Sequence, residues 1–101
     1  MQKMTDAEVT AKLAGAEPAA MTGWSLRNGK LHREYKFPDF KHAIEFMMAA
    51  VPGIDKMNHH PEWANVYNQV KVDLVTHDAG GITQRDFDLA ALLEEGARKV
   101  L

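Results

Sequence analysis

Three of the five histidines occupy positions of the kind where catalytic side chains are often found. His59 and His60 are adjacent in a segment without clean hydrophobic periodicity, and His77 follows a predicted strand, close to a diglycine. Loops and strand ends of this kind carry a large share of binding and catalytic residues. Imidazole has an unperturbed pKa of about 6.5 and can act as acid or base near neutrality. Brought together, these three side chains would suit proton transfer at two points on one small molecule.

Each of these residues also has a simpler structural interpretation. A single histidine at a strand end is more often a turn residue than a catalyst, and adjacent side chains diverge, so His59 and His60 could both be solvated. Asp86 stands on the inward stripe of a predicted helix. It could be the acidic member of a Thr83-x-x-Asp86 capping box, or it could orient a histidine. The other two histidines fall on predicted element surfaces and receive no role: His32 and His42.

Other chemistries find little support in the sequence. A zinc site would need three histidines and a carboxylate: His59, His60, His77 and Asp55 or Asp86. Neighbouring histidines cannot easily face one ion, however, and no His-x-x-x-His spacing is present. Ser25 is the only serine and falls within a predicted strand, and the chain has no cysteine for a thiol nucleophile. We therefore expect no metal ion and no cofactor.

The chain composition is that of a small globular domain, which we expect to span residues 1–101. Hydrophobic residues make up 46% and charged residues 26%, and 12 Lys+Arg against 14 Asp+Glu give a formal net charge of -2. This balance gives no electrostatic reason to bind nucleic acid. Residues 1–20 lack the apolar run of an export signal, and residues 44–51 are too short to span a membrane. We expect a cytoplasmic protein with no membrane partner.

The first half of the chain predicts a helix, a hairpin and a second helix. Thr5-x-x-Glu8 is a capping box that opens a helix over residues 6–14. Strands at 24–27 and 30–37 flank Asn28-Gly29, a type I′ turn sequence that sets Leu26 opposite Leu31. The second helix begins at a cap on Asp39 and is expected to stop at Pro52-Gly53. Its predicted inward stripe consists of apolar residues at helical spacing: Phe40, Ile44, Met47, Met48 and Val51.

The second half predicts another strand pair and a third helix. The strands are expected at 65–68 and 70–76, and Thr83 opens the helix. The inward stripe of that helix is Leu89, Ala90, Leu93, Ala97 and Val100. The order α-β-β-α-β-β-α, with a hairpin joining each strand pair, predicts an α+β fold. It is a two-layer α/β sandwich of a four-stranded antiparallel sheet with three helices on one face.

The spacing of the polar residues resembles a known family signature. Asp55-x-x-x-His59-His60-Pro61, followed by Tyr67, His77 and Asp86 at fixed intervals, resembles the pterin-4a-carbinolamine dehydratases. The likeness is dense over residues 55–93 and looser over residues 24–51. Seven specified positions at fixed spacing are a far stronger signal than an adjacent pair of histidines.

The resemblance implies a reaction and a set of roles. The family dehydrates 4a-hydroxytetrahydrobiopterin or a related pterin to the quinonoid dihydropterin, recycling the cofactor of aromatic amino acid hydroxylases. It implies catalytic roles for His59, His60 and His77, with His60 and His77 as the proton-transfer pair. Asp55 and Asp86 would hold the histidines, and four further residues would bind substrate: Pro61, Trp63, Thr76 and Asp78. We expect Trp63 and Tyr67 near the site mouth or in the core hairpin, and the sequence does not choose between these two places.

The resemblance also implies self-association and raises an alternative function. A homodimer or homotetramer is implied, in keeping with a small core and free sheet edges. Animal members of the family stabilise the dimer of a homeodomain transcription factor through a helical surface. The alternative is therefore a protein-interaction module, with Met47, Met48 and Val51 as candidate surface residues.

Overall fold

The helices and strands follow the predicted order α-β-β-α-β-β-α in a computed structural model, which describes residues 2–15 and 21–100. Their bounds are α1 Asp6–Gly15, β1 Ser25–Arg27, β2 Lys30–Lys36, α3 Phe40–Met57, β3 Glu62–Val66, β4 Gln69–Leu74 and α4 Gln84–Val100. A short 3-10 helix, η1 His77–Ala79, follows β4. The predicted α+β class is confirmed.

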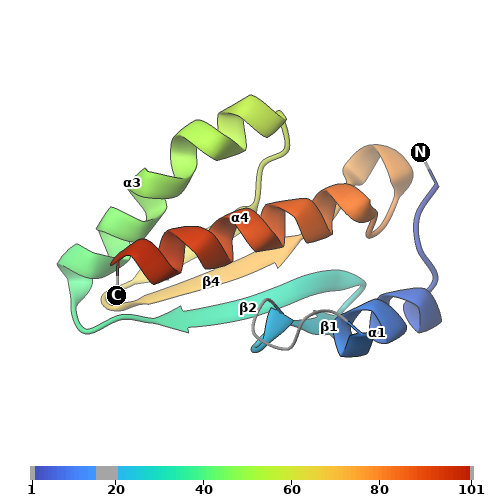
Figure 1. Cartoon of the computed structure of the whole chain (residues 1–101), viewed down its shortest axis with the longest axis horizontal. Coiled ribbons are helices and arrows are strands. Elements are labelled where there is room, and N and C mark those ends of the chain that lie inside the picture. The colour runs from blue at the N-terminus through green and yellow to red at the C-terminus, as the bar shows by residue number, and fades with distance from the viewer. Residues whose placement is uncertain (1, 16–20, 101) are drawn as a thin grey trace.

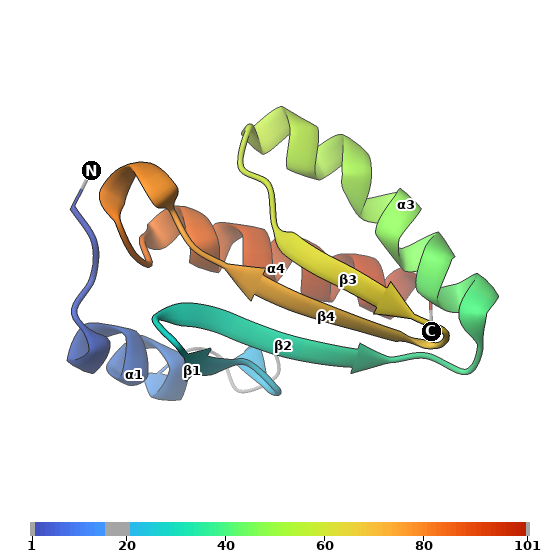
Figure 2. The same cartoon turned by 180° about the vertical axis from the view of Figure 1, so that it is seen from behind.

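The four strands form one antiparallel sheet in the order β1-β2-β4-β3. Helix α4 lies in front of the strands in Figure 1 and behind them in Figure 2, with α3 on the side of β3 and α1 on the side of β1. Helices α1, α3 and α4 all contribute buried side chains to one hydrophobic core. Because β3 and β4 are antiparallel neighbours, the start of β3 and the end of β4 lie at the same end of the sheet.

The first hairpin has the predicted turn and register. Asn28 and Gly29 both adopt positive φ angles, 52° and 76°, as a type I′ turn requires. Leu26 is paired with Leu31, and Arg27 with Lys30. Apolar side chains of this hairpin and its borders are buried in the core: Trp24, Leu31, Tyr35 and Phe37.

The second hairpin is shifted from the prediction. Strand β3 runs over Glu62–Val66, and the turn is formed by Tyr67 and Asn68, which the prediction placed in the strand. Tyr67 adopts a left-handed conformation, with φ of 51°. The Asn65 side-chain amide donates hydrogen bonds to the carbonyls of Tyr67 and Gln69 and so closes the turn. Pairing with β4 extends β3 back to Glu62. The hydrophobic pattern of the segment itself does not indicate this pairing.

The predicted stop of the second helix at Pro52-Gly53 is wrong. Helix α3 continues through Pro52 and ends at Met57, where Asn58 takes a left-handed conformation. Gly53 serves helix packing instead, since a Cβ on it would lie 2.5 Å from the Leu92 Cδ1 atom of α4. The buried residues on either side, Ala50 and Ile54, anchor α3 to the core and offset the loss of one hydrogen bond at Pro52.

The predicted inward stripe of α3 is wrong for three of its five residues, whereas Ile44 and Met47 are half-buried and Met47 packs against the core. Phe40 is 50% exposed, Met48 66% and Val51 39%. The buried face is instead Ala43, Phe46, Ala50 and Ile54. Alanine contributes little to a hydrophobic pattern, so the larger side chains on the neighbouring face dominated the prediction. Helix α3 consequently carries apolar residues on two faces, one buried and one exposed.

The two remaining helices begin as predicted. Thr5 and Glu8 exchange hydrogen bonds as a capping box at the start of α1. The predicted stripe of α4 is buried apart from Val100, which is half-buried. Within the described ranges, no helix has both the length and the apolar character needed to cross a membrane.

Candidate active site

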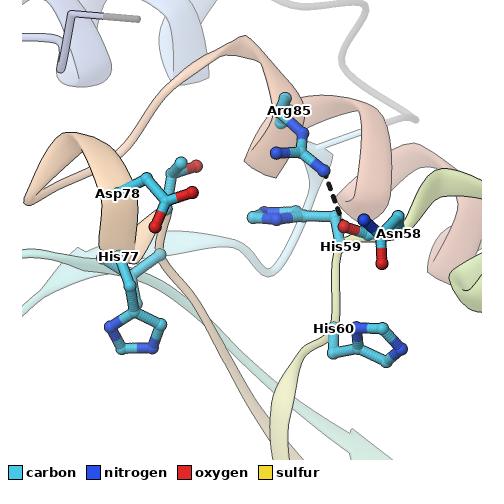
Figure 3. Close-up of a pocket in the computed structure, with 8 residues that line it drawn as sticks. Asn58, His59, His60, His77, Asp78 and Arg85 are labelled. Carbon is cyan, nitrogen blue, oxygen red and sulfur yellow. Dashed lines mark hydrogen bonds between the residues drawn. The ribbon is translucent and has the colours of Figure 1, made fainter.

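The three histidines line one pocket at the end of the sheet where β3 begins and β4 ends. His59 and His60 lie between α3 and β3. His77 is the first residue of η1, three positions after Leu74, the last residue of β4. The pocket has a volume of about 220 Å³ and is lined by Asn58, His59, His60, Val75, Thr76, His77, Asp78 and Arg85. Figure 3 shows His60 and His77 on opposite sides, with the ring of His59 between them in this view. The antiparallel pairing of β3 with β4 therefore brings together residues 17 positions apart (from 60 to 77).

The chain enters the pocket through a fixed turn at the end of α3. Asn58 has φ of 50° and ψ of 44°, a left-handed conformation that asparagine tolerates better than most residues. The Arg85 Nη2 atom donates hydrogen bonds to the carbonyls of Met57 and Asn58, at 3.2 and 2.7 Å. Figure 3 marks the contact with Asn58. Arg85 thus ties the start of α4 to the residue that precedes His59.

His59 is held by the buried carboxylate of Asp86. Its Nε2 atom lies 2.6 Å from Asp86 Oδ1, and the two side chains are 8% and 0% exposed. Asp86 Oδ2 accepts hydrogen bonds from the Thr76 hydroxyl at 2.8 Å and from the backbone N–H of Thr83 at 2.9 Å. Asp86 therefore accepts a hydrogen bond at the start of α4, as in a capping box, and also contacts a histidine, so its contacts are compatible with both alternatives. Because a carboxylate only accepts, the proton of a neutral His59 lies on Nε2.

His60 and His77 are exposed, and each contacts one carboxylate. His60 Nε2 lies 3.2 Å from Asp55 Oδ1, with the two side chains 61% and 70% exposed. His77 Nε2 lies 3.2 Å from Glu62 Oε2, with the histidine 76% exposed. The Asp55 contact matches the predicted supporting role in geometry, whereas Glu62 was not among the predicted site residues.

Glu62 is itself fixed by a lysine on β2. Lys30 Nζ lies 2.6 Å from Glu62 Oε1. The hydrogen bond from Lys30 lowers the pKa of Glu62, and the same contact raises the pKa of Lys30. Glu62 is therefore a carboxylate throughout the neutral range, with one oxygen on Lys30 and the other on His77.

The predicted substrate-binding residues fall into two groups. Thr76 and Asp78 line the pocket, although the Thr76 hydroxyl is engaged by Asp86 and Thr83. Pro61 is half-buried beside the pocket and does not line it. Trp63 packs edge-on against the core residue Phe46, with ring centroids 6.3 Å apart. Tyr67 is 65% exposed and lies in the turn of the β3–β4 hairpin, at the end away from the pocket, so the second of the two expected places applies to it.

Sequence reasoning missed Asn58, Arg85 and Glu62. Asn58 carried a usable signal, because asparagine is a common left-handed residue after a helix, but the expected stop at Pro52 concealed it. Arg85 and Glu62 act through partners far away in the chain, and no local spacing indicates them. Among residues 2–15 and 21–100, no group of three or more His, Asp or Glu side chains is arranged to hold a metal ion.

The fold and the imidazole groups at one end of its sheet define a class of protein, a small α+β domain with three histidines in one pocket. The sequence matches the family described as "Pterin 4 alpha carbinolamine dehydratase" over residues 2–96. A protein of Solibacter usitatus is 52% identical over 92 residues, which cover 91% of this chain and 92% of that protein. A protein of Sulfurisphaera tokodaii is 42% identical over 95 residues, covering 94% and 97%. Both carry the name "Putative pterin-4-alpha-carbinolamine dehydratase".

A solved structure agrees with this relationship. The crystal structure of a "transcriptional coactivator/pterin dehydratase" from Brucella melitensis superposes with a TM-score of 0.84 at 36% identity, covering 95% of this chain and 99% of that one. The chain belongs to the pterin 4 alpha carbinolamine dehydratase family, whose members are hydro-lyases.

Proposed function

We propose that the pocket dehydrates a 4a-hydroxytetrahydropterin to the quinonoid dihydropterin and water. In this elimination the bond between C4a and the hydroxyl oxygen breaks, the hydroxyl leaves as water with an added proton, and a ring nitrogen loses its proton. The reaction thus needs an acid and a base beside one flat heterocycle. The observation that carries the proposal is that three imidazoles from two separate segments line one pocket. Family membership supports the choice of substrate.

We assign different chemical roles to the three histidines according to their exposure to solvent. His60 and His77 form the proton-transfer pair, since each is open to solvent and has one nitrogen on a carboxylate, which leaves Nδ1 for the substrate. His59, buried against Asp86, binds and polarises the 4a-hydroxyl. Asp55 and Asp86 hold His60 and His59 in one tautomer. Thr76 and Asp78, which line the pocket, contribute to substrate binding, and we extend this role to Pro61 and Trp63, which do not line it.

The test is an assay in which the 4a-hydroxytetrahydropterin is generated in situ and the quinonoid product is followed by absorbance. General acid–base catalysis is worth about 10² to 10⁴-fold, so His60→Ala and His77→Ala should each slow the reaction far beyond assay error. The substrate also dehydrates unaided, so the variants should approach that background and not zero. A chelator should change nothing. Wild-type rates in both single variants, or activity lost on chelation, would contradict the histidine mechanism.

A second candidate function uses the exposed apolar face of α3. Phe40, Met48 and Val51 are exposed on one helix, and the name of the Brucella protein includes a coactivator role. We propose that this face associates with protein, either with further copies of the chain in a homodimer or homotetramer or with a partner. Sedimentation should show an oligomer at micromolar concentration that Met48→Lys weakens. A stable wild-type monomer would argue against self-association through this face.

A further inference from the structure

We propose that Glu62 is a positioning residue for His77 and that Lys30 holds Glu62 in place. The inference rests on the proposed function in one respect, that turnover depends on His77. Glu62 opens β3, two positions after His60, and its Oε2 atom lies 3.2 Å from His77 Nε2. Its Oε1 atom lies 2.6 Å from Lys30 Nζ. Each oxygen of one carboxylate therefore has its own cationic or N–H partner.

The sheet topology explains how these three residues meet. Lys30 opens β2, Glu62 opens β3, and β4 runs between these two strands. In the register, Leu31 is paired with Leu74 and Glu62 with Asp73, so both openings lie beside the end of β4 that leads to His77. Neighbouring strands are about 4.8 Å apart, and a contact across β4 therefore needs two long side chains. Lysine and glutamate satisfy this requirement.

The contact determines which nitrogen of His77 is available. A carboxylate accepts and cannot donate, so the proton of a neutral His77 lies on Nε2 and the lone pair on Nδ1. The ring is 76% exposed, so packing does little to fix its rotamer. Glu62 supplies the missing restraint, and Lys30 limits the movement of Glu62. The contacts from Lys30 to Glu62 and from Glu62 to His77 thus present Nδ1 of His77 in one orientation for proton transfer.

The kinetic test compares Glu62→Gln with a matched control. An exposed ion pair has a modest effect, so we expect kcat to fall about two- to fivefold with KM nearly unchanged. Lys30→Met should lower kcat less, and Lys30→Arg, which retains the charge, should restore the wild-type value. The control is Glu34→Gln, which removes a carboxylate of similar exposure, 50%, that pairs with Arg27 outside the pocket. It should leave kcat unchanged, and equal kcat values in Glu62→Gln and wild type would overturn the inference.

A spectroscopic test stands apart from activity. Long-range ¹H–¹⁵N correlation spectra of the ligand-free protein report the tautomer of each imidazole. Wild-type His77 should show the Nε2–H form, and Glu62→Gln should shift its ring nitrogens while those of His59 stay in place. Unchanged His77 resonances in Glu62→Gln would contradict the proposed contact between Glu62 and His77. If the wild-type protein gives no rate above background, the proposed function fails, and these spectra alone then decide whether Glu62 positions His77.

Discussion

The two sides of the histidine pocket are built in opposite ways. On one side His59 and Asp86 are almost completely buried, and the carboxylate also accepts hydrogen bonds from Thr76 and Thr83. On the other side His60 and His77 project into solvent, each with one exposed acidic partner. Breaking a buried pair leaves uncompensated polar groups, whereas an exposed pair contributes little to stability. Under the proposed function, the buried side maintains the architecture of the pocket and holds His59 against the substrate, and the exposed side transfers the protons.

The largest expected effect on stability lies on the buried side. Asp86→Ala leaves His59, Thr76 and the N–H of Thr83 without their acceptor. We expect the free energy of unfolding to fall by about 3–5 kcal/mol, as for other broken buried pairs. Asp55→Ala is the matched change on the exposed side and should alter it by less than about 0.5 kcal/mol. Urea denaturation measures the free energy of unfolding of both variants. Equal losses in the two would contradict the difference between the buried and the exposed side of the pocket.

An intermediate effect is expected at Arg85, which joins the start of α4 to the end of α3. Arg85→Ala removes two hydrogen bonds to the carbonyls at the end of α3. We expect a loss of about 1–2 kcal/mol in unfolding free energy, because charged donors contribute more than neutral ones. KM should also rise, since the turn that presents His59 becomes less fixed. Arg98→Ala is the control, an exposed arginine paired with Glu95 within the same helix. Similar results for the two variants would show that Arg85 has no special role.

The smallest effect concerns His32, a histidine outside the pocket on the open face of the sheet. Its two ring nitrogens contact Asp73 and Glu34, each at 2.8 Å. Partial burial alone would lower the pKa of His32, but the hydrogen bonds to Glu34 and Asp73 outweigh burial, and also outweigh the nearby charge of Arg27, so the pKa is raised.

A raised pKa in the folded state stabilises the protein fully below the unfolded value of about 6.5, and this contribution disappears as pH rises through the folded value. His32→Gln should therefore cost up to about 1 kcal/mol at pH 5.5 and almost nothing at pH 9. Turnover should be unchanged at both values. A stability difference that grows with pH would contradict the raised pKa of His32. Lost turnover would contradict the prediction that His32 takes no part in the reaction.

Several features of the fold were predictable because their causes are local. The Asn28-Gly29 turn fixes its own register through two positive φ angles, and the Thr5–Glu8 capping box closes within four residues. The course of α3 was not predictable in the same way. Two of the four residues on its buried face are alanines, and the fit of Gly53 against Leu92 depends on a second helix.

The candidate site shows the same division. The three histidines could be identified from their types and from the spacing that resembles a known family. The contact of Glu62 with Lys30 joins two strands that the sheet brings together, and the contact of Asp86 with Thr76 spans the turn between β4 and α4. Their partners are separated by 32 and 10 positions in the chain, beyond any helical or strand period. Sequence patterns thus indicate which groups can react, and tertiary pairing determines which groups hold them.

The most direct test of the central claim is the dehydration rate of the His60→Ala/His77→Ala double variant, measured per folded molecule. The comparison predicts an unfolding free energy within about 0.5 kcal/mol of wild type, because both side chains are exposed. It predicts a rate lowered by about 10² to 10⁴-fold towards the uncatalysed background. A double variant that is stable and retains the wild-type rate would show that the exposed histidines do not perform the chemistry.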